Sequence, residues 1–379
     1  MKEGNNMKIK IKQKVLLEHL NYSIKGISNK NLIPILNCIK FELKDDGLYL
    51  SSTDNEIAIN TFITKDKIES IDEEGEIVIS GRYIYDIIRK LNDEIVNIEE
   101  VIDSQVLITT QNSSFKLNCI DPREFPNLEL EYVNEPIVLK QSVFKNAISQ
   151  IIFAASTQES RPVLTGVNFK INNNLLECTA TDSYRLAKRK INLLDSVQNN
   201  VDIIVPSKNL NEIIRMIFDD NKDIELHIFV NKIIFKFGSL IIMSRLINGT
   251  YPDTNKSIPD SFSLKIKTNL NKLYNAIDRA SLLTNEEEKN IINLNTKGDI
   301  AYITSNIPEI GNVEEKIKIN KNNDEEIKIS FSSKYMMDAI KNFDGEEIEI
   351  SFNGEIKPII ITGINNDDLI QLISPIRTF

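Results

Sequence analysis

The sequence has few of the residues on which catalytic and metal sites depend. Its 379 residues include three cysteines, two histidines, 13 glycines and 11 prolines. Cys38, Cys119 and Cys178 are odd in number and far apart, and no CxxC pair occurs, so neither a disulfide framework nor a zinc site is indicated. We expect each cysteine to be a small buried residue, and we expect no metal site.

The usual signatures of enzymes and of exported proteins are also missing. His19 and His227 have no nucleophile and carboxylate near them in sequence, so Ser-His-Asp catalysis has little support. There is no GxGxxG, Walker loop or HExxH motif. No apolar run approaches the roughly 20 residues that cross a bilayer, and the N-terminus lacks an apolar signal core. We therefore expect a cytoplasmic protein without a membrane partner, and we expect residues 1–6 to form a disordered extension.

A helical segment recurs three times along the chain. The segments SGRYIYDIIRKL, PSKNLNEIIRMI and SSKYMMDAIKNF begin at Ser80, Pro206 and Ser332, at intervals of 126 residues. Apolar residues recur at helical spacing in each, for example Ile84 and Ile88 in the first. Each segment is predicted to be an amphipathic helix capped by the serine at its start.

A second set of segments repeats with nearly the same period. KQKVLLEHLNYSIKGI, KQSVFKNAISQIIFAA and KTNLNKLYNAIDRASL begin at Lys12, Lys140 and Lys267. Alternating segments, GLYLSSTDNEIAINTFI and LLECTATDSYRLAKRKI, are predicted strands between the helices. The sequence thus predicts three α+β domains of one fold, each with two helices and about eight strands, over residues 1–134, 135–258 and 259–379.

Positive charge is concentrated in the predicted helices. The six repeated segments carry a net charge of +10, whereas the whole chain has −10, so the rest of the chain carries −20. Helix surfaces often carry lysine and arginine only for solubility, but six basic helices in an acidic chain favour a surface that attracts phosphate. The helices lack an array of side chains suited to reading base edges, so binding should be independent of sequence.

The helix count sets a size for any ring that the helices line. At a spacing of about 8 to 10 Å, six packed helices leave a gap of only roughly 8 Å, whereas twelve leave roughly 25 Å. A DNA duplex fits only the larger hole. One copy is therefore too small to encircle DNA, and two copies in contact head to tail are large enough.

Three motifs carry a resemblance to a known family. With TATDSYRLA from Thr179, DPREFPNLE from Asp121 and the terminal QLISPIRTF, the chain resembles the bacterial DNA polymerase III β subunit, the sliding clamp, over residues 7–379. The resemblance implies the DNA clamp fold, an α+β fold with helices on the inner face and antiparallel sheets outside. It further implies a homodimeric ring that threads duplex DNA and tethers the polymerase, without catalysis or a cofactor, and that a separate ATP-driven clamp loader places on DNA.

The resemblance also implies a pocket for partner peptides between the second and third domains. The clamp loader, the polymerase III catalytic subunit and other proteins with a clamp-binding motif would use it. An apolar groove of this kind accepts Leu and Phe anchors of an extended peptide. The residues carried over are Leu164, Thr181, Ser183, Tyr184, Arg185, Leu186, Pro252, Leu372, Ser374, Pro375, Ile376 and Arg377. From pattern alone, Leu164, Leu186 and Ile376 would be ordinary core residues.

The chain departs from the family's pattern at three points of this pocket. Tyr184 stands where a histidine is common, Ser374 where an apolar residue is usual, and Lys256-Ser257 where a basic-apolar pair often lies. These departures leave the preference for partners open.

The DNA and dimer surfaces carry further expectations. Lys30 and Gln158 match inner-surface positions of the family, and the helix charges add the candidates Arg82, Lys208 and Arg215. For the dimer, the first domain of one copy should meet the third domain of the other. There Phe115 and Leu117, on an edge strand, would face Leu282 and Leu283, and core packing is the competing interpretation of all four.

Two other functions are compatible with the sequence. One is a protein-interaction scaffold that has the fold but does not encircle DNA. The other is an enzyme that uses Thr181 and Asp182 as a site, for which the sequence suggests no substrate. The basic run Lys188-Arg189-Lys190 is predicted to be a solvated strand end.

Overall fold

The computed structural model of the protein describes residues 7–28, 32–92, 95–101, 104–132, 134–217, 221–285 and 290–377. The predicted extension, residues 1–6, and the DNA-contact candidate Lys30 lie outside the described residues. The chain forms two compact units. Unit 1 comprises Met1–Gln141 and Arg215–Leu246, and unit 2 comprises Ser142–Ile214 and Ile247–Phe379.

Each of the six repeated segments contains an α-helix within the described residues. The helices are α1 (Gln13–Ser23), α2 (Gly81–Lys90), α3 (Gln141–Ser149), α4 (Ser207–Met216), α5 (Leu270–Ser281) and α6 (Ser333–Ile340). Their buried residues follow the helical period, as with Ile84 and Ile88 in α2 and Met336 and Ile340 in α6. The periodicity therefore predicted these helices correctly.

The predicted serine caps are only partly present. The Ser332 side chain accepts a hydrogen bond from the Tyr335 backbone N–H, which caps α6. Ser80 lies at the same place before α2, but its side chain makes no cap hydrogen bond, so the predicted cap is wrong there. In α5 the cap is Asn269, which accepts from the Lys272 N–H.

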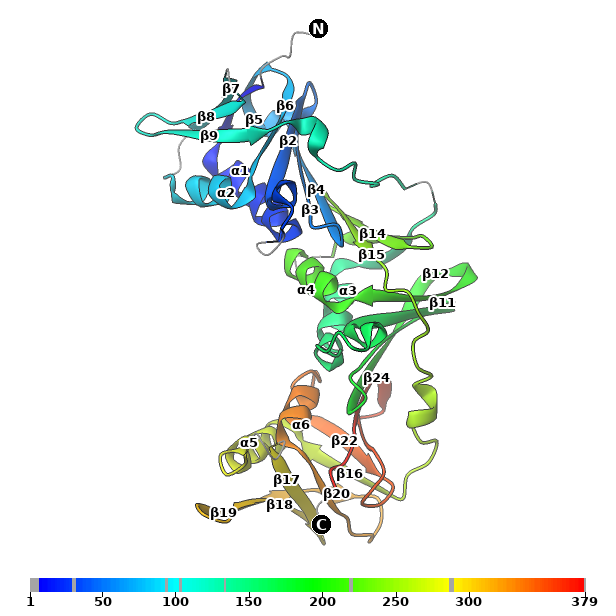
Figure 1. Ribbon diagram of the computed structural model, residues 1–379. Coiled ribbons are helices and arrows are strands. Elements are labelled where there is room, and N and C mark those ends of the chain that lie inside the picture. Colours follow the sequence, from blue (N-terminus) through cyan, green and yellow to red (C-terminus); the bar gives the residue numbers. More distant parts are fainter. Residues whose placement is uncertain are drawn as a thin grey trace. The chain divides into compact units, whose positions relative to one another are not determined.

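Unit 1 contains one antiparallel sheet of thirteen strands, in the order β10-β13-β14-β15-β4-β3-β2-β6-β9-β8-β7-β1-β5. Helices α1 and α2 lie side by side (Figure 1), and their apolar faces pack on these strands around Phe41 and Ile79. The strands are β1 (Lys8–Lys12), β2 (Cys38–Lys44), β3 (Gly47–Thr53), β4 (Ile57–Thr64), β5 (Ile68–Glu73), β6 (Gly75–Ser80), β7 (Ile95–Val101), β8 (Gln105–Thr109), β9 (Ser114–Ile120), β10 (Ile137–Lys140), β13 (Asp223–Ile228), β14 (Lys232–Phe237) and β15 (Leu240–Arg245).

Unit 2 contains a sheet of seven strands, β11-β12-β24-β23-β22-β16-β20, and a sheet of four, β19-β18-β17-β21. Helices α5 and α6 pack against a core that includes Phe331 and Phe352 (Figure 1). The strands are β11 (Gly166–Thr181), β12 (Arg185–Pro206), β16 (Leu264–Asn269), β17 (Ile291–Lys297), β18 (Ile300–Ile307), β19 (Gly311–Lys318), β20 (Asn320–Lys321), β21 (Lys328–Ser332), β22 (Glu347–Phe352), β23 (Ile359–Gly363) and β24 (Asn366–Ile373).

The sheets join successive repeats in the same way in both units. In unit 1, strand β4 of the first repeat pairs antiparallel with β15, the last strand of the second repeat. In unit 2, strand β12 of the second repeat pairs antiparallel with β24, the last strand of the third. In each case the strand after a hairpin turn supplies the edge to which the next repeat adds its final strand.

Among the described residues, no helix is both long enough and apolar enough to cross a membrane. The three cysteines have free thiols; Cys38 and Cys178 are buried, but Cys119 is only partly buried, so the prediction of burial is wrong for Cys119. It lies near the end of β9, beside strand β6.

Candidate functional site

Thr181 and Asp182 build the turn that connects β11 to β12. The Asp182 carboxylate accepts hydrogen bonds from the backbone N–H groups of Tyr184 (2.9 Å) and Arg185 (3.0 Å). The Thr181 hydroxyl donates to the Arg185 carbonyl (2.6 Å) and accepts from the Ser183 N–H (3.1 Å). Ser183 has a φ of 77°, a left-handed conformation that the turn holds in place.

These hydrogen bonds give Thr181 and Asp182 a structural role in the turn and do not arrange them for catalysis. The single hydroxyl proton of Thr181 is donated to a carbonyl oxygen, and among the described residues no side-chain base is hydrogen-bonded to this hydroxyl. The Thr181 N–H donates to the Tyr251 hydroxyl (3.0 Å), which ties the segment after β15 to the turn. Burial raises the pKa of Tyr251 above its usual value, so the phenol stays protonated and serves as a structural contact.

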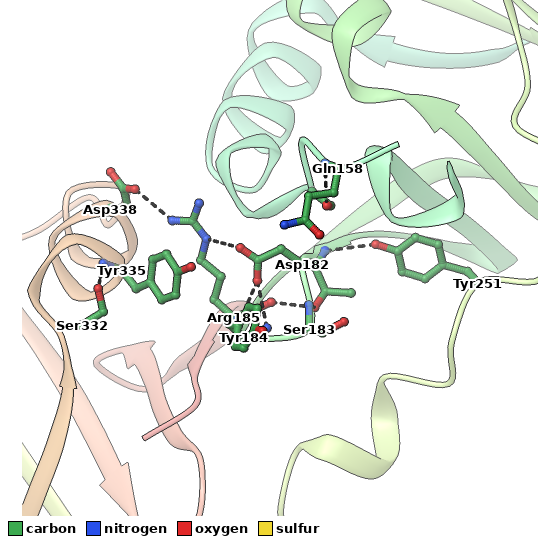
Figure 2. A network of polar contacts seen from close by, with 11 residues as sticks. Gln158, Asp182, Ser183, Tyr184, Arg185, Tyr251, Ser332, Tyr335 and Asp338 are labelled. Carbon is green, nitrogen blue, oxygen red and sulfur yellow. Dashed lines mark hydrogen bonds and ion pairs between the residues drawn. The ribbon is translucent and has the colours of Figure 1, made fainter. Parts of the chain in front are cut away.

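Arg185 joins this turn to helix α6. Its Nε donates to Asp182 (3.0 Å) and its Nη1 to Asp338 (2.9 Å), as Figure 2 shows. Its guanidinium also lies 5.2 Å from the ring centre of Phe153 and 4.4 Å from that of Tyr335. The Arg185 side chain is only 13% exposed, and its hydrogen-bonding edge is directed at carboxylates of this chain.

Asp338 is held in its charged form by this arrangement. Burial acts to raise its pKa, but hydrogen bonds from Lys341 and Arg185 outweigh burial, and the pKa lies below the usual value. The Lys341 ammonium is 2.6 Å from Asp338 Oδ1. The two carboxylates nearest to Arg185 therefore both have cationic partners.

A pocket of about 490 Å³ lies beside this turn in unit 2. One wall is the C-terminal tail, which continues the β24 pairing: the Ser374 N–H donates to the Tyr184 carbonyl (2.9 Å), and the Ile376 N–H to that of Ser330 (2.7 Å). The rest of the lining comes from the end of β21, the start of α6 and the residue before β17. The described lining residues are Tyr184, Asn290, Ser332, Lys334, Tyr335, Ser374, Pro375, Ile376 and Arg377.

The structure brings five of the twelve predicted pocket residues together in this lining: Tyr184, Ser374, Pro375, Ile376 and Arg377. Leu186 and Leu372 face each other across β12 and β24 and belong to a buried cluster with Ile360. Leu164 is buried in another cluster, with Tyr251. Thr181, Ser183 and Arg185 belong to the hairpin turn described above, and Pro252 is exposed beside Tyr251.

Sequence reasoning missed this second part of the pocket lining. Asn290, Ser332, Lys334 and Tyr335 line it, and Asp338 anchors it through Arg185. The only signal available was the repeat, because four of these five residues lie in the SSKYMMDAIKNF segment.

Lys188 overturns one prediction for this region. It is 2% exposed, and its ammonium donates to Glu177 (2.9 Å) and to Asn255 (2.6 Å). The prediction of a solvated strand end is therefore wrong for Lys188, because β12 lies between β11 and β24 at this point and is not a free strand end. Arg189 and Lys190 are partly exposed, and Lys190 pairs with Asp367.

The remaining candidates lie on surfaces. Arg82 on α2, Lys208 and Arg215 on α4, and Gln158 in the loop after α3 are exposed. Phe115 on β9 is 36% exposed and Leu282, directly after α5, is 79% exposed, while Leu117 and Leu283 are partly exposed. In the described ranges no three His, Cys, Asp or Glu side chains are grouped to bind a metal ion.

Comparisons with known proteins agree over the full length of the chain. Family models for the N-terminal, central and C-terminal domains of the DNA polymerase III beta subunit match residues 7–129, 138–253 and 255–377. The beta sliding clamp of Staphylococcus aureus is 41% identical over 377 residues, which cover 98% of this chain and 100% of the relative.

Solved structures show the same similarity. The DNA polymerase sliding clamp from Bacillus subtilis superposes with a TM-score of 0.95 at 37% identity, over 99% of this chain and 100% of that one. The DNA polymerase III beta chain of Streptococcus pneumoniae gives 0.92 at 30% identity, over 98% and 100%. The predicted fold class, α+β with three repeated clamp domains, is confirmed. The chain belongs to the DNA polymerase III beta subunit family and is a DNA sliding clamp, a non-catalytic component of DNA replication.

Proposed function

We propose that two copies of this chain close head to tail into a ring around duplex DNA, and that the ring tethers the replicative polymerase. The proposal includes the partners that the resemblance implies: duplex DNA, a second copy, the polymerase III catalytic subunit, a clamp loader and other proteins with a clamp-binding motif, in the cytoplasm. It also includes domain limits at 1–134, 135–258 and 259–379.

The observation that carries the proposal is a pair of strand edges that have no partner strand among the described residues. Strands β4 and β12 each receive the last strand of the following repeat, β15 and β24. The equivalent strand of the third repeat, β19, is the outer strand of its sheet. The last strand of the first repeat, β9, pairs through residues 114–118 with β8 alone, and only its final two residues also reach β6. A second copy would supply the partner strand that each of these two edges lacks.

The repeat also gives the register of that missing pairing. Met243 on β15 lies opposite Ala58 on β4. Leu117 precedes Met243 by the 126-residue period, so the two residues are equivalent. Ser305 donates a hydrogen bond to the end of α5 as Ser52 does to the end of α1, so these two serines are also equivalent. Counting along the two hairpins from these serines makes Asn312 the equivalent of Ala58. We therefore expect Leu117 of one copy to lie opposite Asn312 of the other.

Apolar surface at the helix ends fits the same seam. Phe153 and Leu282 each lie five residues after the isoleucine of an Asn-Ala-Ile sequence. Phe153 packs on the core of the third repeat, whereas Leu282 is 79% exposed. A second copy would cover Leu282 in the way that the third repeat covers Phe153, which would remove apolar surface from water.

For DNA we propose contact through basic residues of the repeated helices, with Arg82, Lys208 and Arg215 as candidates, and through Lys30 and Gln158, which lie outside the repeated segments in the sequence. Contacts to phosphate from such helices carry no base specificity. For partner peptides we propose the pocket of unit 2, where Tyr184, Pro375 and Ile376 offer apolar surface to Leu and Phe anchors.

Sedimentation of a seam variant tests the ring. Leu282→Lys combined with Leu283→Lys should give folded monomers, because two charges replace apolar surface that the second copy would cover. Lys272→Glu, a charge change elsewhere on α5, should remain a dimer. An unaltered dimer in the double variant would refute the seam. A monomeric natural chain that still binds peptides would instead favour the scaffold without a ring.

A further inference from the structure

We propose that the chain has a site of spontaneous covalent modification at Asn248, where the backbone of Gly249 converts the side-chain amide into an acid. The Gly249 nitrogen loses its proton to water and bonds to the side-chain carbonyl carbon of Asn248, which closes a succinimide. The bond from that carbon to the amide nitrogen breaks, and the nitrogen takes up a proton and leaves as ammonia. Water then opens the succinimide at either carbonyl and gives aspartate or isoaspartate. The reaction needs neither a partner protein nor a second copy of the chain.

The sequence offers this reaction at two places. An asparagine directly precedes a glycine at Asn248-Gly249 and at Asn353-Gly354. Glycine favours the reaction because no side chain hinders its nitrogen and because its backbone reaches conformations that other residues rarely adopt. The surroundings of each asparagine therefore decide which of the two reacts.

The Asn248 side chain is free to rotate toward the Gly249 nitrogen. Asn248 is exposed, in the segment after β15 where residues 246–254 form neither helix nor strand. Within the part of the chain that the structure describes, neither the Asn248 side chain nor the Gly249 N–H makes a hydrogen bond. The two reacting atoms can therefore approach each other without the loss of a native contact.

The packing around Gly249 requires a glycine there. Its φ is 134°, in the left-handed range that favours glycine. A Cβ atom at this position would lie only 2.7 Å from Cγ1 of Val163. Val163 packs with Ile247 on the buried cluster that contains Tyr251. The fold therefore keeps the glycine that makes Asn248 reactive.

Asn353 is held where Asn248 is not. Its Oδ1 accepts a hydrogen bond from the Ser263 N–H (2.8 Å), and its Nδ2 donates to the Ser261 carbonyl (2.5 Å). Gly354 also has a positive φ, 87°, so the conformation of the glycine does not separate the two pairs. Rotation of Asn353 toward the Gly354 nitrogen breaks both hydrogen bonds, which raises the barrier to reaction. The chain thus contains its own control.

The isoaspartyl product would change the segment that supports the β11–β12 turn. In this product the backbone runs through the side-chain carbon of residue 248 and is one carbon longer. The Ile247 N–H donates to the Ile204 carbonyl (2.9 Å), and the Tyr251 hydroxyl accepts from the Thr181 N–H (3.0 Å). These contacts fix the two ends of a short segment, so we expect the added carbon to loosen the contact between Tyr251 and Thr181.

Peptide mapping of the stored, folded full-length chain tests the site. Conversion replaces the amide NH2 by OH, and mass spectrometry detects the gain in mass in the tryptic peptide Leu246–Lys256, where fragmentation separates Asn248 from Asn255. Asn248 should convert at least about tenfold faster than Asn353, because two hydrogen bonds hold Asn353. The rate should rise with pH, because the attacking nitrogen must lose its proton. A methyltransferase specific for isoaspartate, supplied with S-adenosylmethionine, should label the product.

Two controls assign the selectivity to the fold. In denaturant neither asparagine has its native contacts, so both should convert at similar rates. Asn248→Gln keeps an amide but lengthens the side chain by one carbon, which disfavours closure onto the Gly249 nitrogen, and it should abolish the gain in mass. Circular dichroism verifies that this variant is folded.

Each outcome bears on one claim. If Asn248 stays intact in the folded chain while the denatured chain converts, the proposed site is wrong. Equal rates at Asn248 and Asn353 in the folded chain would overturn the role of the Asn353 hydrogen bonds. Hydrogen exchange of the Thr181 amide should be faster in the isoaspartyl form than in Asn248→Asp, which adds the charge without the carbon. Equal exchange in these two forms would overturn the expected loosening of the turn.

Discussion

The hairpin turns at Thr53–Ile57 and Thr181–Arg185 have the same hydrogen bonds in two different settings. The Thr53 hydroxyl donates to the Ile57 carbonyl (2.8 Å) and accepts from the Asn55 N–H. Asp54 accepts from the next two N–H groups, at 3.0 and 2.9 Å. The φ angle of Asn55 is 76°, and that of Ser183 is 77°.

The difference begins with the residue that ends each turn. Ile57 is 3% exposed and pairs with Ser244 in unit 1. Arg185 occupies the same place in unit 2, where it binds Asp338 and stacks on Tyr335 at the edge of the pocket. The Thr-Asp pair therefore builds the turn in both repeats. The proposed surface for a partner comes from the side chains that follow the turn and from the C-terminal tail.

Deletion of Pro375–Phe379 should have the largest effect on peptide binding. It removes the wall that contains Pro375, Ile376 and Arg377 and the hydrogen bond from Ile376 to Ser330. We expect peptide binding to be lost in anisotropy measurements while sedimentation still shows a dimer. Loss of the dimer would show that the pocket is misplaced.

The stability of unit 1 should depend on pH through a buried histidine. His19 on α1 is 3% exposed and hydrogen-bonded to Thr61 (2.7 Å), and burial, with a contribution from Lys67, lowers its pKa to about 4. The second repeat has Ala147 at the equivalent position of its first helix. Below pH 6.5 His19 binds a proton in the unfolded state but not in the folded state. The free energy of unfolding of unit 1 should therefore fall as the pH decreases toward 4, by about 3 kcal/mol in total.

Hydrogen exchange of the α1 amides measures this loss directly. Protection of α1 should decrease between pH 6.5 and 4 after correction for intrinsic exchange, and the decrease should be smaller in His19→Asn. The same pH dependence in both chains would contradict the assignment to His19.

Arg185→Ile makes the second turn resemble the first. We expect the turn to survive, the free energy of unfolding of unit 2 to fall by about 2 kcal/mol because Asp182 and Asp338 each lose a partner, and peptide binding to weaken about tenfold as Tyr335 loses its support. Lys341→Ala removes the other partner of Asp338 and should cost less. Unchanged peptide affinity in Arg185→Ile would show that Arg185 does not position the pocket.

The smallest effect should be equal in the two turns. Thr53→Val and Thr181→Val each remove one hydroxyl that donates to a carbonyl, and each should cost about 1 kcal/mol. Neither should change peptide affinity by more than about twofold, a change below 0.5 kcal/mol. A much larger loss of binding in Thr181→Val would indicate that the Thr181 hydroxyl contacts the ligand.

The sequence was sufficient for the features that depend on short spacing. The helices follow from apolar residues such as Ile84 and Ile88, and the hairpins from alternation and the Thr-Asp pairs. The direction of the Arg185 side chain depends on Phe153 and Asp338, and the latter is 153 residues away in the chain. The sequence around Arg185 does not distinguish a side chain that stacks against α6 from one that is exposed in the pocket.

Burial of Lys188 was unpredictable for the same reason. A run of three basic residues at a strand end is typically solvated, but Glu177 across the hairpin and Asn255 from a later segment both bind the Lys188 ammonium. The pairing of β12 with β24, which places Lys188 inside the sheet opposite Ile370, joins segments 182 residues apart at that point. The motif of the C-terminal tail indicated a role in the pocket. Its hydrogen bonds to Tyr184 and Ser330 could not be predicted, because they depend on the tertiary structure.

Retention on DNA of different topology tests the ring most directly. After loading by a clamp loader onto nicked circular DNA, the clamp should stay bound through gel filtration at high salt and should dissociate once the DNA is cut at a single site. Such behaviour requires a closed ring, because salt screens the contacts with phosphate but does not open a topological link. Equal loss from circular and linear DNA at high salt, or retention on the cut DNA, would contradict the account.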